Sequence, residues 1–334
     1  MVLTKEEYKG RIEVRVITDC VVRNKEFFHF IAMDRKTGNS DAAYLETNVI
    51  KYEIGIYLDS EVGKRCSRSE FTGWDYLFVG ATKTDEVNEV VLVDWGGNVY
   101  ARGGGANKME KKIPSTMRKG VIKRIRMIGG RLYVVGDLNT ACYRKGIDKW
   151  ESLKLNVHLP AARGFGFNSK QYEIVDMDGY SFNELYAISR KDFIWHFNGA
   201  EWEKIQFPSN IYLDCVCCAG DGNVYISGMN GTIFKGQRND WKEIHKGDME
   251  LPFQDIVWHA GKVWCTNQYD LWTIEDDRLT QVDLDEKMKV CTGHLSVGDG
   301  VMLAAGKYGA AYHDGETWHL LFNTKEFGDT GGWE

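Results

Sequence analysis

Long apolar runs are absent from this 334-residue sequence. No stretch of about 18 consecutive apolar residues occurs, which argues against a helix that crosses a membrane. The first residues, MVLTKEEYKGRIEV, contain neither an apolar core nor a small-residue cleavage site, so we expect no secretory signal. The eight cysteines are then expected to be reduced thiols. Together these absences predict a cytoplasmic protein.

Proline is scarce, with four residues, whereas glycine is abundant, with 36, which fits many tight turns and few rigid linkers. No window of ten or more residues shows helical periodicity, so the sequence predicts an all-β fold. Apolar residues make up 43% of the chain, which is enough to build a continuous core.

An excess of positive charge is also missing, because the formal net charge is −6 and the isoelectric point is about 5.8. This balance argues against general electrostatic binding to nucleic acid or to an anionic membrane. An acidic surface can still attract a basic protein, so a basic protein partner is the expectation that remains.

A unit of short strands recurs along the chain. Its clearest copy is Gly220–Trp241, in which an apolar run, a tight turn and a return strand precede a tryptophan. Two anchor positions repeat with this unit. The first recurs every 39 residues, at Tyr186, Tyr225, Trp264 and Leu303. The second recurs every 38 or 39 residues, at Trp202, Trp241, Leu279 and Trp318. Met109 takes this second position in an earlier copy.

A period near 40 built only of short strands is typical of a β-propeller, with one four-stranded sheet, or blade, per repeat. We predict a single domain over residues 1–334, closed by N-terminal and C-terminal strands, with residues 12–22 supplying the closing strand. The seven blades are expected at residues 10–60, 71–113, 121–155, 172–206, 212–244, 254–283 and 290–322. Six blades are the alternative if residues 10–60 form an extension instead.

The turn before the second anchor resembles that of the bacterial neuraminidase (Asp-box) and WD-repeat-like propeller superfamily. The resemblance rests on FNGAEW (197–202), GQRNDW (236–241) and HDGETW (313–318), and it covers about residues 75–322. HDGETW is one residue short of the Asp-box pattern S-x-D-x-G-x-T-W. The Gly-His and Trp-Asp signatures of WD repeats are missing from the regular blades. The resemblance therefore implies the fold and leaves the function open.

Catalytic signatures are sparse. A sialidase-type hydrolase on this fold needs three arginines that converge on a carboxylate, a tyrosine nucleophile and an acid. No pattern aims three arginines at one point, and solvated or ion-paired arginines are the favoured interpretation. The candidates are Arg102, Arg124, Arg126, Arg163 and Arg190.

No cofactor and no metal site is expected. The cluster Cys215-Val216-Cys217-Cys218 has no second cysteine pair or histidine at metal-ligand spacing, which favours buried thiols in an inner strand. The triplet Gly103-Gly104-Gly105 lacks the Lys-Ser/Thr of a phosphate loop and indicates a turn. Residues 111–126 carry seven basic side chains in sixteen, but no interleaved aromatic residues. A solvated edge is therefore favoured there over a nucleic-acid site.

Recognition residues are expected on the face where loops converge. The turns between the second and third strands share a face with the connections between blades. One connection is long, because Tyr133 and Tyr186 are 53 residues apart, 14 more than the period. Exposed Trp, Tyr, Arg and Met are typical of protein-binding hot spots. The predicted partner-binding residues are Trp95, Asp137, Asn139, Arg163, Phe165, Phe167, Arg190, Asp192, Met229, Asn230, Phe253, Asn267, Tyr269, Lys307 and Tyr308.

These features predict a non-catalytic, monomeric, protein-binding propeller. Acidic stand-alone propellers without catalytic signatures resemble some immunity proteins of bacterial competition systems, so neutralisation of a toxin is the more specific hypothesis. Two alternatives stay open: a glycan hydrolase or lyase with a central pocket, and a scaffold whose loop face binds several partners.

Overall fold

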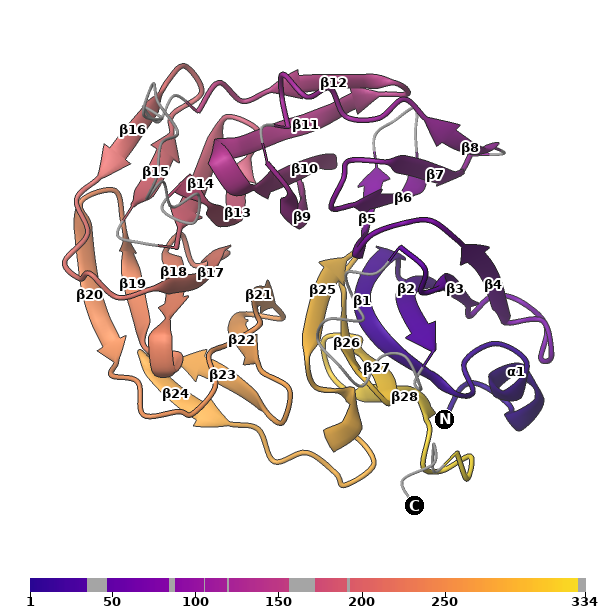
Figure 1. The fold of residues 1–334 in the computed structure, drawn as a ribbon. Coiled ribbons are helices and arrows are strands. Elements are labelled where there is room, and N and C mark those ends of the chain that lie inside the picture. Colours follow the sequence, from indigo (N-terminus) through magenta and orange to yellow (C-terminus); the bar gives the residue numbers. More distant parts are fainter. Residues whose placement is uncertain are drawn as a thin grey trace.

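The computed structural model describes residues 1–34, 47–83, 88–104, 106–118, 120–155, 172–190 and 193–329. Within these ranges the chain forms seven four-stranded sheets, arranged as a ring around a central axis (Figure 1). Residues 15–71 build a complete first sheet of four strands. The predicted all-β, seven-bladed propeller is therefore confirmed, and the six-bladed alternative is wrong.

Each sheet is an antiparallel meander in which four consecutive strands pair in chain order. The first strands, nearest the axis, are β1 (Arg15–Asn24), β5 (Leu77–Lys83), β9 (Ile122–Ile128), β13 (Ile174–Ser181), β17 (Leu213–Cys218), β21 (Asp255–His259) and β25 (His294–Gly298). The second strands are β2 (Phe27–Asp34), β6 (Asn88–Asp94), β10 (Arg131–Gly136), β14 (Glu184–Ser189), β18 (Val224–Gly228), β22 (Lys262–Thr266) and β26 (Val301–Gly306).

The third strands are β3 (Lys51–Tyr57), β7 (Val99–Gly103), β11 (Thr140–Gly146), β15 (Ile194–Phe197), β19 (Ile233–Gln237), β23 (Leu271–Glu275) and β27 (Gly309–His313). The fourth strands, at the outside of the ring, are β4 (Cys66–Phe71), β8 (Ala106–Glu110), β12 (Lys149–Ser152), β16 (Trp202–Ile205), β20 (Asp240–His245), β24 (Arg278–Gln281) and β28 (Trp318–Asn323).

Helix is almost absent from the described chain. It contains one α-helix, α1 (Lys5–Lys9), and the 3-10 turns η2 (Asp137–Asn139), η4 (Met229–Gly231) and η5 (Lys289–Cys291). Thr4 caps α1, because its hydroxyl accepts a hydrogen bond from the backbone of Glu7. None of the helices in the described ranges is long and apolar enough to cross a membrane.

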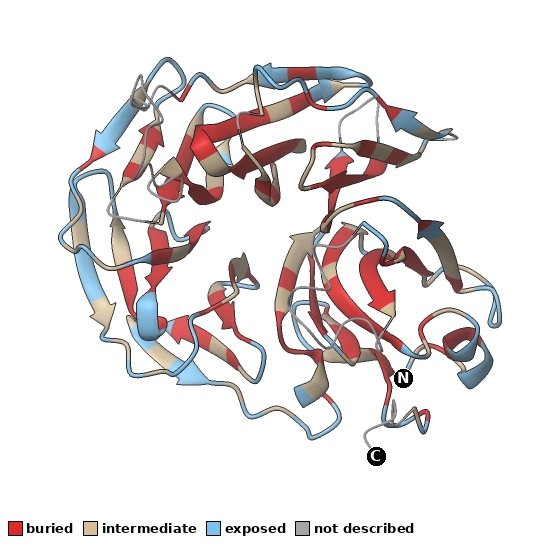
Figure 2. Cartoon of the chain, viewed as in Figure 1, coloured by how far each residue is buried: buried red, intermediate tan, exposed pale blue. Residues whose placement is uncertain are grey.

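The second strands are buried on both faces. Val90, Val91, Leu92 and Val93 of β6 are each at most 1% exposed. A strand that is covered on both sides needs a continuous apolar run, and β-branched residues suit it. The fourth strands are more exposed to solvent. In β24, for example, three of the four residues are exposed (Figure 2). Burial therefore decreases from the second strand to the rim of each blade.

Neighbouring sheets share apolar clusters, and the repeated anchors complete them. Between the fourth and fifth sheets, Tyr186 of β14 packs with Val216 of β17 and Ile226 of β18. Trp241 of β20 covers this cluster from the rim and is partly buried. Trp202 packs in the same way against the cluster between the third and fourth sheets, and Trp318 against the cluster between the sixth and seventh sheets. Residues that are 39 positions apart in the sequence therefore occupy equivalent packing positions in successive sheets.

The ring closes differently from the expectation for residues 12–22. β1 pairs with β2 along its length, so it belongs to the first sheet and is not a strand of the last. It packs against β25 and β26, and the backbone N–H of Val22 donates to the hydroxyl of Ser296 at 3.0 Å. The backbone N–H of Ile17 donates to the carbonyl of Lys307 at 3.2 Å.

The first residues of the chain complete the closure. The backbone N–H groups of Val2 and Leu3 donate to the carbonyls of Leu320 and Leu321 in β28, at 2.9 and 3.1 Å. Tyr8 is fully buried, and its ring stacks on Phe327 with centroids 4.5 Å apart. The two ends of the chain are thereby joined by hydrogen bonds and by aromatic packing, as the predicted closure by N-terminal and C-terminal segments requires.

Replacement of the anchor Trp241 by alanine should lower the free energy of unfolding by about 2–3 kcal/mol, because the partly buried indole fills an inter-sheet cluster. Met109 provides a matched control. It occupies the same repeat position in the second sheet but is 59% exposed, so Met109→Ala should cost less than about 0.5 kcal/mol. Urea unfolding of both variants measures the difference, and equal losses would contradict the packing role.

Candidate functional site

Two connected cavities run along the axis of the ring. The inner one, which we call the throat, has a volume of about 400 Å³ and is lined by residues from all seven first strands, among them Asp19, Arg124, Arg126, Asp178, Asp255 and His294. The outer one, which we call the mouth, has a volume of about 790 Å³ and is lined by Trp95, Tyr269, Lys289, Lys307, Tyr308 and Lys325, among others. Thr18, Tyr76 and His294 line both cavities, so throat and mouth form one funnel.

Turns on the loop face position the side chains of the mouth. We use this name for the face that carries the turns between second and third strands and the connections between sheets. Trp95 lies in the β6–β7 turn, Tyr269 in the β22–β23 turn, and Lys307 and Tyr308 in the β26–β27 turn. Four of the residues predicted from the sequence thus meet in one cavity. Tyr269 is 66% exposed, so its ring is free to contact a partner.

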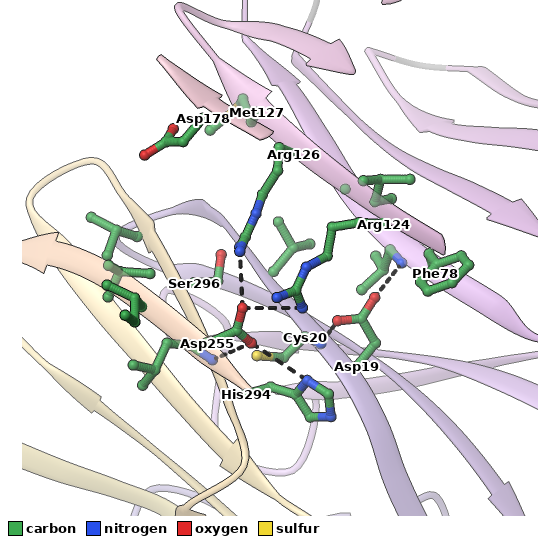
Figure 3. A pocket seen from close by; sticks show the side chains of 18 of the residues that line it. Asp19, Cys20, Phe78, Arg124, Arg126, Met127, Asp178, Asp255, His294 and Ser296 are labelled. Atoms are coloured by element: carbon green, nitrogen blue, oxygen red, sulfur yellow. Dashed lines mark hydrogen bonds and ion pairs between the residues drawn. The ribbon is translucent and has the colours of Figure 1, made fainter. Parts of the chain in front are cut away.

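Two arginines of β9 cross the throat toward carboxylates on other sheets. Arg126 forms a double hydrogen bond with Asp176 of β13, from Nε at 2.8 Å and from Nη2 at 2.7 Å. Its Nη1 also lies 3.2 Å from Oδ1 of Asp255 in β21. Arg124 contacts the same oxygen from Nη1 at 3.2 Å (Figure 3). Two positive and two negative groups therefore balance each other in the centre of the ring.

The axial carboxylates also join neighbouring sheets through backbone N–H groups. Asp19 of β1 accepts from Val79 of β5 at 2.9 Å. Asp255 of β21 accepts from Leu295 of β25 at 3.2 Å. Asp176 makes the equivalent bond to β17, from the N–H of Val216 at 3.1 Å. These aspartates are acceptors in the fold, because they satisfy N–H groups that the sheets leave unpaired at the axis.

The charge network shifts the pKa values of its members. Burial by itself would raise the pKa of Asp255, but the positive charges of Arg124 and Arg126 outweigh it and hold this pKa well below its usual range. Asp178 forms no ion pair with any residue in the described part of the chain, although the charge of Arg126 acts on it from farther away. Burial raises its pKa to about 6, although its hydrogen bond from the N–H of Cys218 acts in the opposite direction. Burial also raises the pKa of Asp19, so two carboxyls of the throat favour the protonated form more than a free aspartate does.

The arrangement of the throat does not match the hydrolase constellation considered from the sequence. The described lining contains two arginines and no glutamate. Both arginines are engaged by aspartates of the protein, so they are not free to bind the carboxylate of a ligand. Among the described residues, no group of three or more His, Cys, Asp and Glu side chains is placed to hold a metal ion. Cys215 and Cys217 are buried in the core between the fifth and sixth sheets.

The other predicted recognition residues lie outside the described lining of the funnel. Met229 and Asn230 are exposed on the loop face. Arg190 is partly exposed and donates from Nε to Glu173 at 2.8 Å. Asp137 is partly exposed in the adjacent β10–β11 turn. These four remain candidates for contacts beyond the mouth. Arg163, Phe165, Phe167 and Asp192 lie outside the described residues.

Three predicted contact residues are buried, which is a correction to the expectation of exposed side chains. Phe253 is 2% exposed, because its ring packs edge-on against Trp272 in the core. Asn267 is 6% exposed, and its Oδ1 accepts from the backbone of the β22–β23 turn. Asn139 is 5% exposed. These side chains support the loop face and do not form its surface.

Sequence reasoning considered Arg124 and Arg126 as candidates for a hydrolase site, and it missed the axial aspartates and two lysines of the mouth. Residues 111–126 indicated a solvated edge, yet Arg124 and Arg126 belong to the first strand β9 and point to the axis. One signal was available. In β9 the arginines occupy alternate positions, and a strand with period-2 charges has one polar face. Lys289 lies in η5, between β24 and β25, and Lys325 follows the last strand, β28; no pattern marks either lysine.

The raised pKa of Asp178 makes a pH-dependent prediction. Its folded-state pKa of about 6 exceeds that of an unfolded aspartate, so its contribution to stability is present below about pH 4 and is lost as pH rises through 6. Asp178→Asn retains an acceptor for the N–H of Cys218 and cannot ionise. We expect the variant to exceed the parent protein in unfolding free energy by about 1–3 kcal/mol at pH 8 and by about half as much at pH 5, where only part of the carboxyl would have ionised. Urea titrations at both pH values test this, and an equal difference at each would refute it.

Comparison with known proteins gives one extended sequence similarity. No family model matches the chain. Immune protein Tsi7 of Pseudomonas aeruginosa is 24% identical over 298 residues, which cover 81% of this chain and 95% of that protein.

Solved structures are similar in fold. Sqt1 of Saccharomyces cerevisiae has a TM-score of 0.60 and 12% identity, over 93% of this chain and 86% of its own. A catalytically inactive virginiamycin B lyase from Staphylococcus aureus, solved with quinupristin, has a TM-score of 0.53 and 10% identity, over 72% and 83%. At such identities the structures show the propeller architecture alone. The chain is thus similar to an immune protein in sequence and to propellers of varied kinds in fold.

Proposed function

We propose that this chain is a non-catalytic immunity protein, a cytoplasmic monomer that binds a toxin protein through its loop face and neutralises it. The observation that carries the proposal is the similarity to Immune protein Tsi7, which extends over 81% of this chain. The fold supports it, because a ring of sheets holds the loop tips on a rigid frame. The exposed aromatic side chains of the mouth supply the kind of contact area that protein interfaces use.

The proposed partner is a toxin domain with a basic surface. The formal net charge of −6 favours the approach of a positively charged protein and speeds its encounter at low salt. A general attraction of this kind acts over about a Debye length and does not select one docking site. The local chemistry of the mouth therefore has to provide the specificity.

The enzymatic and scaffold alternatives are less well supported. The arginines of the throat are bound to Asp176 and Asp255 across the axis, which leaves no free arginine cluster for a sugar carboxylate. The structural similarity to a lyase concerns the fold and not a set of residues. A scaffold with several partners has no observation in its favour beyond the fold, which many unrelated functions share.

Tyr269→Ala tests the loop face. The exposed ring at the rim of the mouth should act as a contact anchor, so its removal should weaken binding of the toxin encoded next to this gene by about tenfold or more. Phe182→Ala is the matched control, because Phe182 is 44% exposed in the β13–β14 turn of the opposite face. It should leave affinity unchanged. Calorimetric titration measures both, and cell survival during toxin expression gives the functional readout.

The proposal makes a further demand on the wild-type chain. It must bind the neighbouring toxin in calorimetry and protect cells that express it. Failure of the wild-type protein in both assays would overturn the proposed function. Loss of protection by the Phe182 variant alone would move the interface to the opposite face.

A further inference from the structure

The mouth of the funnel is positively charged, in contrast to the rest of the molecule. Its described lining includes Lys289, Lys307 and Lys325 and no aspartate or glutamate. All three lysines are exposed. The whole chain carries a formal net charge of −6, so this concentration of one sign does not follow from composition. A local positive site on an acidic protein indicates a ligand group of negative charge.

Two of the three lysines of the mouth are uncompensated, whereas Lys289 has the acidic neighbours Glu286, Asp270 and Asp283. Lys307 and Lys325 form no ion pair within the described part of the chain. Lys289 pairs with Glu286, whose side chain is 84% exposed and does not belong to the lining. A surface pair of this kind contributes little and is readily exchanged for another partner. The throat below differs, because its arginines are already matched by aspartates.

We propose that the mouth receives an acidic loop of the toxin, with aspartate or glutamate side chains that pair with Lys289, Lys307 and Lys325. This inference rests on the proposed function and adds the chemistry of the contact. The loop belongs to a domain that is basic on balance. The net charge of this chain attracts that domain, and the lysines of the mouth then select its acidic segment.

The dimensions and the rim of the mouth fit a protein loop. A volume of about 790 Å³ is within the range of sites that enclose several side chains. Trp95, Tyr269 and Tyr308 border the same cavity and offer apolar contact area beside the charges. The ring of Trp95 is itself covered by Lys123, whose Nζ lies 4.8 Å from the ring centroid. Aromatic anchors next to charged groups are the usual composition of a binding hot spot.

A nucleic-acid ligand fits the mouth less well. Nucleic-acid sites follow the backbone with an extended positive stripe, whereas these three lysines lie together beside the seventh sheet, on one side of the depression. A chain with a net charge of −6 repels a long polyanion such as nucleic acid. The same net charge attracts a basic domain, even if that domain carries one acidic loop. Arginines suited to double hydrogen bonds with phosphate are engaged in the throat. A carboxylate-bearing protein segment is therefore the occupant that the charges favour.

A pair of triple variants separates local from global charge. The mouth variant carries Lys289→Glu, Lys307→Glu and Lys325→Glu. The control carries Lys25→Glu, Lys64→Glu and Lys149→Glu, three exposed lysines on turns or strand starts of the opposite face. Each substitution changes the charge by two units, so both variants go from −6 to −12. Thermal unfolding should be unchanged, because all six side chains are exposed.

Calorimetric titration with the toxin encoded next to this gene provides the readout. We expect the mouth variant to lose affinity by about tenfold or more. The control should remain within about twofold of the wild-type chain. Acetyl-hexaglutamate amide, as a minimal acidic probe, should bind the wild-type chain weakly and the mouth variant not at all.

The outcomes distinguish this inference from the proposed function. If both variants bind the toxin like the wild-type chain, or lose affinity equally, the acidic-loop contact is overturned while the immunity function stands. If a 12-nucleotide single strand binds the mouth and hexaglutamate does not, the site is assigned to nucleic acid and the inference is overturned. If the wild-type chain does not bind the toxin, the proposed function fails and this inference fails with it.

Discussion

Each sheet of this protein has two faces that need cover, and that constraint determines the architecture. The second strands are buried on both sides, so a single blade has no stable form by itself. A ring covers both faces of every sheet only if the last sheet packs against the first. The packing of β1 on β25 and β26, with Val2 and Leu3 bonded to β28, provides that contact. The loop face and its funnel exist because the ring is closed.

At the axis the same arrangement creates an electrostatic problem. On three of the first strands, β5, β17 and β25, a backbone N–H group is bound by an aspartate from the preceding sheet. Buried carboxylates require counter-charges, which Arg124 and Arg126 supply. The two arginines of β9 are thereby paired with aspartates inside the ring and stabilise it. In the proposed function, recognition falls to the lysines and aromatic side chains farther out, where water still reaches them.

The fold could be predicted from the sequence because its determinants repeat. Trp202, Trp241 and Trp318 mark equivalent inter-sheet positions, and their spacing gave the blade length without any long-range information. The throat could not be predicted, because Arg126 and Asp255 are brought together only by closure of the ring. Four residues of the mouth were predicted from turn chemistry. Phe253 was predicted to be exposed but is buried, because the sequence of a connection does not reveal which way a single aromatic ring faces.

The ion pairs from β9 to β21 span the throat and bypass two intervening sheets, those that begin with β13 and β17. They act as a brace across the opening, because Arg124 also donates from Nη2 to the carbonyl of Gln254 at 2.7 Å on the far side. All the groups of this brace belong to the chain itself, so the opening is formed without a partner. Binding of the proposed partner would then cost the protein little conformational entropy. Selection of the partner by shape and its slow dissociation would follow from the rigidity of the propeller as well as from the contacts themselves.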